Sequence, residues 1–197
     1  MSTLDQFGGL EAARGQFEAT EREARALAGS LSEAEFNWQP APGSWSIGQC
    51  LQHLATGTDE VLPAIDRAIA TARQQQWMAQ GPVRYGLFAR MMVTSMEPPP
   101  RFRMKTNRIF EPTRESLRRD AILAELTASR ERILERVRQS VGLNIKRAIV
   151  VSPVSRLIRV PLGAYLAFLA AHDRRHLWQA HQVREASGFG QPATFAH

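Results

Sequence analysis

Two histidines one helical turn apart are the residues of this sequence best placed to do chemistry. His172 and His176 lie in the stretch A-A-H-D-R-R-H-L-W-Q-A-H-Q-V, which covers residues 170–183. Side chains four residues apart project from one face of an α-helix, with Cβ atoms about 5–6 Å apart. Two imidazoles at that separation can bind the same metal ion, usually zinc or another transition metal. The spacing therefore permits a metal site.

The same two histidines are expected to face inward. They continue an apolar stripe with helical spacing, whose other members are Leu162, Leu166, Leu169 and Val183. A buried neutral imidazole needs hydrogen-bond partners, and shared coordination of a cation would provide them. A pair of hydrogen-bonded core histidines is the alternative, and only a third ligand would favour the metal.

A third histidine follows a proline-rich loop in the stretch N-W-Q-P-A-P-G-S-W-S-I-G-Q-C-L-Q-H-L, residues 37–54. Ser46 and Gln49 have the spacing of a capping box, which predicts a helix from Ile47 to about Ala72. His53 lies about 100° from the centre of the apolar stripe of that helix. It is either a boundary histidine or one that faces a cleft between helices.

The composition is typical of a soluble globular protein. Of the 197 residues, 44% are hydrophobic and 22% charged, which predicts a single domain over residues 1–197 with a loose tail over 188–197. No apolar run approaches the roughly 20 residues that span a bilayer, and the N-terminus lacks the pattern of a signal peptide. With Cys50 as the only cysteine, we expect a cytoplasmic protein without a membrane partner.

The middle of the sequence is strongly basic. Residues 101–159 contain 15 Lys and Arg against 6 Asp and Glu, which would suit nucleic acid, an acidic membrane surface or an anionic small molecule. The arginines alternate with glutamates along a predicted amphipathic helix, and a solvated helix face explains them better; they include Arg130, Arg132, Arg136 and Arg138. Nucleic acid binding is not expected, because no known motif accompanies the charge.

Helical periodicity dominates the sequence and predicts an all-α fold. The helices expected cover residues 4–29, 32–36, 47–72, 85–96, 114–141 and 161–186. The segment 144–160 is compatible with either a short helix or an extended chain, since Pro153 interrupts both.

The two histidine-containing stretches together resemble the DinB-like (DinB/YfiT) family of metal-dependent proteins. The resemblance rests on W-Q-P-A-P-G-S-W-S-I-G-Q-C-L-Q-H-L and H-D-R-R-H-L-W-Q-A-H-Q-V, and it extends to the segment E-P-P-P-R-F-R-M-K at residues 97–105. It implies a four-helix bundle with long crossover connections and additional short helices. It also implies a homodimer.

The resemblance further implies that His53, His172 and His176 bind one divalent metal, nickel or zinc, with manganese or iron as alternatives. His181 lies on roughly the opposite side of the helix and is not expected to be a ligand. Three histidines leave coordination positions open for water or substrate. Thiol S-transfer and hydrolysis of a small electrophilic substrate both fit this chemistry, the former with a low-molecular-weight thiol. A non-catalytic metal-binding or damage-response protein that uses its basic middle is the alternative.

Helix geometry predicts which residues surround the metal. Gln49 and Thr56 share the face of His53, and Gln179 shares that of His176. Asp173 could orient an imidazole, although pairing with neighbouring arginines in solvent is an alternative. Glu60 is the candidate general base, unless it is simply an exposed helical glutamate.

Overall fold

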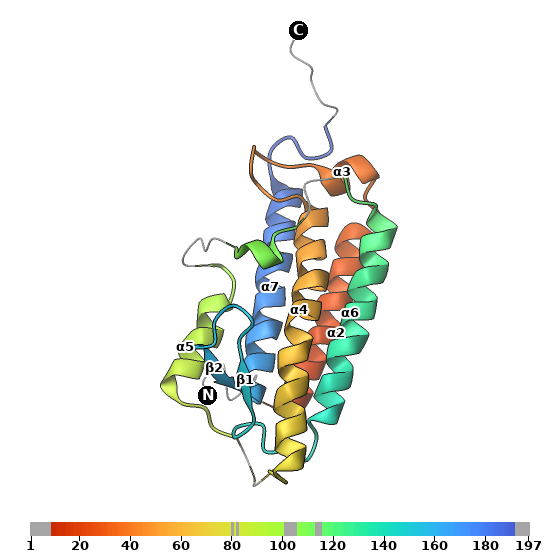
Figure 1. Ribbon diagram of the computed structural model, residues 1–197. Coiled ribbons are helices and arrows are strands. Elements are labelled where there is room, and N and C mark those ends of the chain that lie inside the picture. The colour runs from red at the N-terminus through yellow and green to blue at the C-terminus, as the bar shows by residue number, and fades with distance from the viewer. Residues whose placement is uncertain (1–8, 80, 82, 101–105, 113–115, 192–197) are drawn as a thin grey trace.

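Four long helices form the body of the protein. The computed structural model describes residues 9–79, 81, 83–100, 106–112 and 116–191. The helices α2 (Leu10–Ala28), α4 (Ile47–Gln74), α6 (Arg119–Gln139) and α7 (Leu162–Glu185) lie side by side as a bundle (Figure 1). The prediction of an all-α fold built on a four-helix bundle is confirmed.

The order of the helices around the bundle brings α4 and α7 together. Helix α4 packs against α7 and α6, and α2 also packs against α7 and α6. The two diagonals of the bundle are therefore α2 with α4 and α6 with α7. Figure 1 shows α4 running downward and α7 upward, so the two are antiparallel. The start of α4 therefore lies beside the end of α7.

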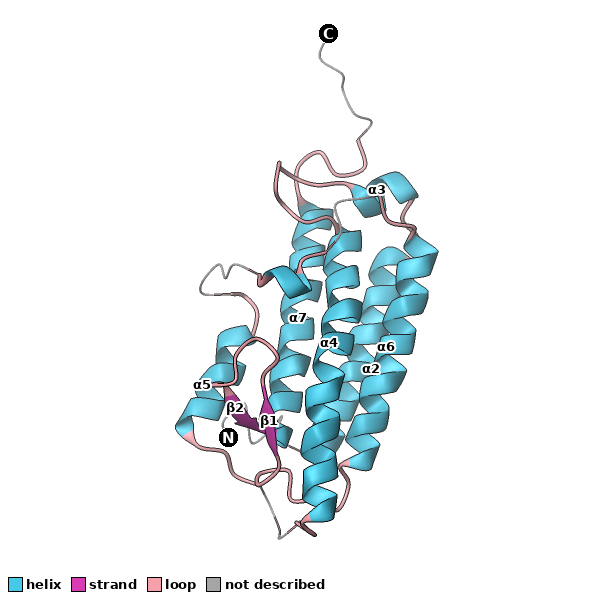
Figure 2. Ribbon diagram, viewed as in Figure 1, coloured by secondary structure: helices cyan, strands magenta, loops and turns pink. Residues whose placement is uncertain are grey.

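Long connections join the bundle helices. The first contains the short α3 (Glu33–Asn37), and the second contains α5 (Leu87–Met96) and the single 3-10 turn η1 (Arg108–Phe110). The third contains two short antiparallel strands, β1 (Ile149–Val151) and β2 (Arg159–Pro161), which Figure 2 distinguishes from the helices. The segment left ambiguous by the sequence is therefore largely a hairpin, with Pro153 in its connecting loop.

Helix starts follow the sequence closely. Ser32 and Ser46 each accept a hydrogen bond from the backbone N–H three residues later, and Glu35 and Gln49 return one, so both capping boxes are present. The predicted start of the first helix at residue 4, the first two residues of the predicted helix 114–141, residues 101–105 and the end of the tail lie outside the described residues. In the described part of the chain, no helix has the length and hydrophobicity needed to cross a membrane.

Candidate metal centre

The two antiparallel helices α4 and α7 bring three histidines to one point. His53 lies in the second turn of α4, and His172 and His176 lie one turn apart near the middle of α7. One ring nitrogen from each histidine lies within 4.8 Å of the corresponding atoms of the other two. The three residues named by the sequence therefore form a cluster (the histidine triad).

Hydrogen bonds fix the ring orientation of two members. Nδ1 of His53 donates to the carbonyl oxygen of Phe110 in η1 at 2.6 Å, and Nδ1 of His176 donates to Oε1 of Gln179 at 3.1 Å. Because both acceptors are carbonyl-type oxygens, each Nδ1 carries the proton. In the neutral rings, Nε2 of His53 and Nε2 of His176 therefore carry no proton. Each of these nitrogens has a lone pair on the side of the ring opposite the hydrogen bond.

The distances within the triad suit a bound cation. Nε2 of His53 lies 3.2 Å from Nε2 of His172. Two nitrogens bound to one tetrahedral metal at 2.0–2.1 Å are about 3.4 Å apart. A proton on His172 can satisfy one neighbouring lone pair, whereas a divalent cation satisfies all three nitrogens at once. The donor set thus fits a borderline metal such as zinc or nickel.

Burial keeps the triad neutral. Burial, helped by the nearby positive charges of Arg130 and of protonated His53, lowers the pKa of His172 to about 3. Burial also lowers the pKa of His53, against the opposing hydrogen bond to Phe110, and lowers that of His176 well below its usual value. Neutral imidazoles are the form that binds metals, so the site needs no deprotonation near neutral pH.

The triad opens onto a large cavity and is partly covered by aromatic rings. Trp45 stacks on His176 with ring centroids 5.5 Å apart and planes 20° apart, and it also contacts His53. Phe168 stacks on His172 from the other side, at 6.3 Å. The three histidines line a cavity of about 1460 Å³ together with residues of α4, α5, α7 and the loops above them. Substrate-sized molecules can therefore reach the histidines.

The residues expected around the metal divide into two groups. Gln179 contacts His176 directly, and Gln49 lines the cavity while its side chain accepts from Ser46 and Gln39. Thr56 and Glu60 are exposed on α4 and are not among the described residues that line the cavity. The structure therefore does not bring the predicted general base to the triad.

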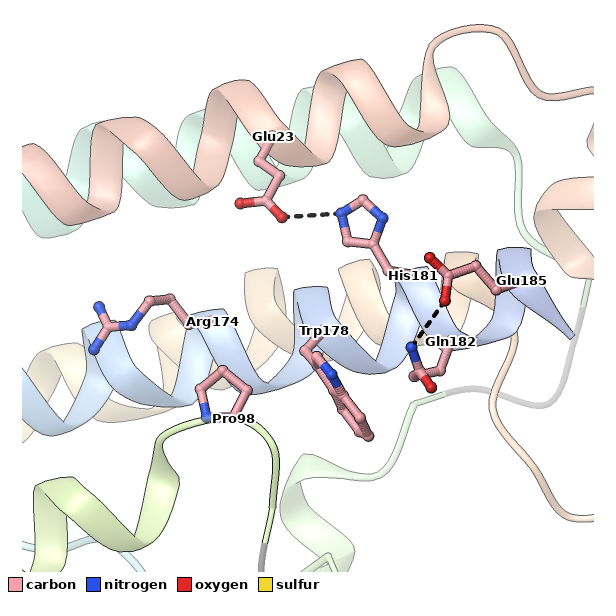
Figure 3. Close-up of a pocket in the computed structure, with 7 residues that line it drawn as sticks. All are labelled: Glu23, Pro98, Arg174, Trp178, His181, Gln182 and Glu185. Carbon is pink, nitrogen blue, oxygen red and sulfur yellow. Dashed lines mark hydrogen bonds and ion pairs between the residues drawn. The ribbon is translucent and has the colours of Figure 1, made fainter.

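His181 lies apart from the triad, as its helical angle predicted. Nε2 of His181 lies 2.9 Å from Oε1 of Glu23 on α2, and the imidazole is 38% exposed. Figure 3 shows it in a separate, smaller pocket between α2 and α7, next to Trp178 and Glu185.

A second buried polar cluster lies at the same level of the bundle. It separates two apolar halves of the core, one containing Phe17 and Ile65 and the other Leu51 and Leu126. Each helix contributes to this polar layer, which consists of Thr20, Thr58, Ser129, Arg130 and Asp173. The two threonines and the serine donate to helix carbonyl oxygens, which leaves two opposite charges at the centre.

Arg130 connects all four helices. Its Nη1 lies 2.8 Å from Oδ2 of Asp173 on α7, and 3.5 Å from the hydroxyl of Thr58 on α4. Its guanidinium also lies over the ring of Phe17 on α2, at 5.7 Å. The prediction that Arg130 belongs to a solvated helix face is wrong, because only 1% of the residue is exposed. The reason is visible in the spacing: Arg130 continues the buried stripe of Leu126, Ile133 and Val137.

Asp173 is paired with Arg130 rather than with arginines in solvent. Burial raises its pKa to about 6, and the positive charges of Arg130 and Arg174 oppose this rise. The contact with Arg130 is close but is not an aligned hydrogen bond, because Oδ2 of Asp173 has no hydrogen-bond partner among the described groups. Nε and Nη2 of Arg130 also lack a hydrogen-bond partner among these groups. The ion pair is therefore compensated in charge but incompletely hydrogen-bonded.

Comparison with known proteins agrees with this architecture. A search of curated proteins and a search of solved structures found no match to the chain. The family model described as the DinB superfamily matches residues 16–180, a range that includes the triad, all of α4 and α6 and most of α2 and α7. This chain therefore belongs to the DinB superfamily.

Proposed function

We propose that this protein is a metal-dependent enzyme, a thiol S-transferase or a hydrolase that acts on a small electrophilic substrate. The observation that supports it most strongly is the convergence of three neutral imidazoles at the wall of a cavity of about 1460 Å³. A structural metal site usually has a closed set of four protein ligands, whereas three histidines leave room for water or substrate.

His53, His172 and His176 would hold the metal, with nickel or zinc as the proposed ion. When bound, such an ion lowers the pKa of a water or thiol and polarises a carbonyl group. The chain itself contributes the orientation of the ligands. Phe110 and Gln179 hold the rings of His53 and His176 with Nε2 toward the common point, and Trp45 covers one side of it.

The alternative is a non-catalytic metal-binding or damage-response protein that uses the basic middle segment. It has less support, because three arginines of α6 are paired with aspartates of α4 and α7. Arg132 pairs with Asp59 and Arg136 with Asp66, both through two short contacts, and Arg130 is buried. A salt-dependent affinity for DNA or RNA would nevertheless support this alternative. The cytoplasmic location and the homodimer remain predictions, and a monomeric mass in solution would contradict the latter.

Metal analysis tests the proposal. We expect tag-free wild-type protein to contain one divalent ion per chain, and His172→Ala to lose it, because two imidazoles bind far more weakly than three. His181→Ala is the matched control, since it removes a histidine from the same helix outside the triad. Undiminished metal in His172→Ala would refute the site.

Activity is then screened with wild-type protein, using thiols and small electrophiles in all pairs, and esters or amides for hydrolysis. We expect turnover by the wild type and by His181→Ala, and none by His172→Ala. Equal turnover by all three would place the reaction elsewhere.

A further inference from the structure

The cavity changes its chemical character along α7. In chain order, α7 contributes Tyr165, Phe168 and Leu169, then the histidines with Asp173 and Arg175, then the two amides Gln179 and Gln182 together with Trp178 and Val183. The 17 residue steps from Tyr165 to Gln182 correspond to about 25 Å of helix at 1.5 Å per step. The histidine triad therefore lies between an apolar end and a polar end of one elongated cavity.

Amide side chains dominate the polar end. The residues that define this glutamine arm are Gln39, Ser44, Gln49, Gln179 and Gln182. Nε2 of Gln39 donates to Oε1 of Gln49 at 2.8 Å, and Oε1 of Gln179 accepts from His176, so these amides are held in fixed orientations. Each amide offers both donors and acceptors, and none carries a charge. Such a surface suits a neutral group with several hydroxyls or amides.

Apolar side chains from two other elements dominate the opposite end. This apolar arm contains Phe88, Met92 and Met96 of α5, Ile158 of the hairpin and Phe168 of α7. Phe88 is 62% exposed although it lines the cavity. An aromatic ring left in water at a cavity wall is available to contact an apolar ligand.

Charged groups contribute little to this lining. Asp173 is paired with Arg130, and Arg175 donates to the carbonyl oxygen of Ser95 at 3.3 Å. Glu111 is the other charged residue among the described lining residues, and it is exposed to solvent. No charged residue belongs to the glutamine arm as defined above, so that arm favours a neutral polar group.

We propose that the cavity binds an elongated amphiphilic small molecule, with an alkyl or aryl group in the apolar arm and a neutral hydroxyl- or amide-rich group in the glutamine arm. Its volume of about 1460 Å³ exceeds the roughly 300–1,000 Å³ of pockets for compact ligands. The middle of such a molecule would lie against the triad. That the reacting bond of the ligand lies beside the triad rests on the proposed function. Binding of the ligand in the two arms does not require the metal.

Calorimetric titration with butyl, hexyl and octyl β-D-glucosides below their micelle concentrations tests this inference. We expect the affinity to rise up to about fourfold for each added CH₂, the factor that corresponds to full burial of a CH₂ group, until the arm is filled. Glucose and octanoate should bind at least about tenfold more weakly than octyl glucoside, because each lacks one of the two recognised parts. Equal affinity along the series, or a preference for octanoate, would overturn the proposal.

Variants assign the two ends of the ligand. Phe88→Ser should remove most of the dependence on chain length, while Leu87→Ser, its neighbour at 82% exposure outside the cavity lining, should not. Gln182→Leu should weaken glucoside binding about tenfold. If Leu87→Ser acts like Phe88→Ser, the alkyl chain binds the outer surface of α5 and the inference fails.

Metal-stripped and metal-loaded protein are titrated in parallel. Equal glucoside binding by both supports the two arms whether or not the loaded protein is an enzyme. If glucoside binding requires the metal and does not respond to Phe88→Ser or Gln182→Leu, the two arms do not bind the ligand. That result would leave the proposed function intact.

Discussion

The histidine triad and the Arg130–Asp173 pair are two buried polar clusters that begin at adjacent residues of α7. The triad lies at a cavity wall and brings one ring nitrogen of each histidine close to the other two. The ion pair is almost fully buried, with side-chain exposures of 1% and 3%, although Asp173 also borders the cavity, and each charge offsets the other. The difference indicates that burial of polar groups alone does not mark a functional site.

What separates the two clusters is the partner that each still needs. Arg130 and Asp173 compensate their charges within the chain, at the cost of a few unmade hydrogen bonds. In the triad, hydrogen bonds to Phe110 and Gln179 orient the rings of His53 and His176. These rings converge on a point that a group from outside the chain could occupy. The Arg130–Asp173 pair is therefore expected to stabilise the core, whereas the triad is compatible with metal binding.

Removing one charge of the ion pair should have the largest effect on stability. Asp173→Asn leaves the guanidinium of Arg130 buried without a counter-charge, and we expect a loss of about 3–5 kcal/mol in the free energy of unfolding. Urea denaturation of metal-free protein measures it. The double variant Arg130→Met, Asp173→Leu should recover most of the loss, because an apolar pair can replace a buried ion pair.

The control for this prediction is the exposed pair between Arg132 and Asp59, whose side chains are 41% and 44% exposed. Asp59→Asn should change the unfolding free energy by less than about 1 kcal/mol. If Asp173→Asn is as mild as Asp59→Asn, the buried pair does not stabilise the core. If the double variant is stable but binds no metal, the two clusters are one functional unit.

In metal-free protein, lowering the pH should change the stability contributions of the two clusters in opposite directions. The folded-state pKa of His172 is about 3, against about 6.5 in an unfolded chain. Between these values the unfolded state binds more protons, so this contribution to stability is complete above pH 6.5 and falls as the pH falls. The lowered pKa values of His53 and His176 act in the same direction.

Asp173 acts in the opposite direction, because its raised pKa of about 6 makes the folded state bind more protons between about 3.8 and 6. Three histidines outweigh one aspartate, so we expect a net loss of stability from pH 7.5 to pH 5. Urea denaturation at both values measures it, and His172→Ala should flatten the dependence. A protein more stable at pH 5 would contradict the neutral triad.

The smallest effect should come from a residue that only orients a ligand. Gln179→Ala removes the acceptor for Nδ1 of His176, and we expect a 10- to 100-fold loss of metal affinity, with little change in metal-free stability. Competition with a chelator measures the affinity. Gln182→Ala lines the same cavity without a recorded contact to the triad and should retain wild-type affinity; an equal loss in both variants would remove the orienting role of Gln179.

The triad could be predicted because its spacing follows helical geometry. His172 and His176 share a face by their four-residue separation, and the resemblance to the DinB-like family supplied His53. Gln179 followed by the same helical rule. The sequence could not decide between a general base and an exposed glutamate for Glu60, nor place Thr56 away from the cavity, because the edge of α4 that the cavity occupies depends on how α5, η1 and the loop over residues 38–46 cover the bundle.

The ion pair was misjudged for a different reason. A sequence of alternating arginines and glutamates is typical of a solvated face, and this describes Arg132, Arg136 and Arg138 correctly. Arg130 differs only in lying on the apolar stripe, four residues after Leu126 and three before Ile133. Its partner Asp173 comes from a helix on the opposite diagonal, so the pairing depends on the tertiary arrangement and has no local signal.

The adjacency of His172 and Asp173 has a mechanical consequence. Consecutive residues of a helix point about 100° apart, so a rotation of α7 about its axis displaces both side chains together. Turning His172 away from the common point of the triad would also drag Asp173 away from Arg130, which contacts the other three helices. The contacts of Arg130 with Asp173 and with its neighbours on α2 and α4 therefore help to fix the rotation of α7, and with it the direction in which His172 points.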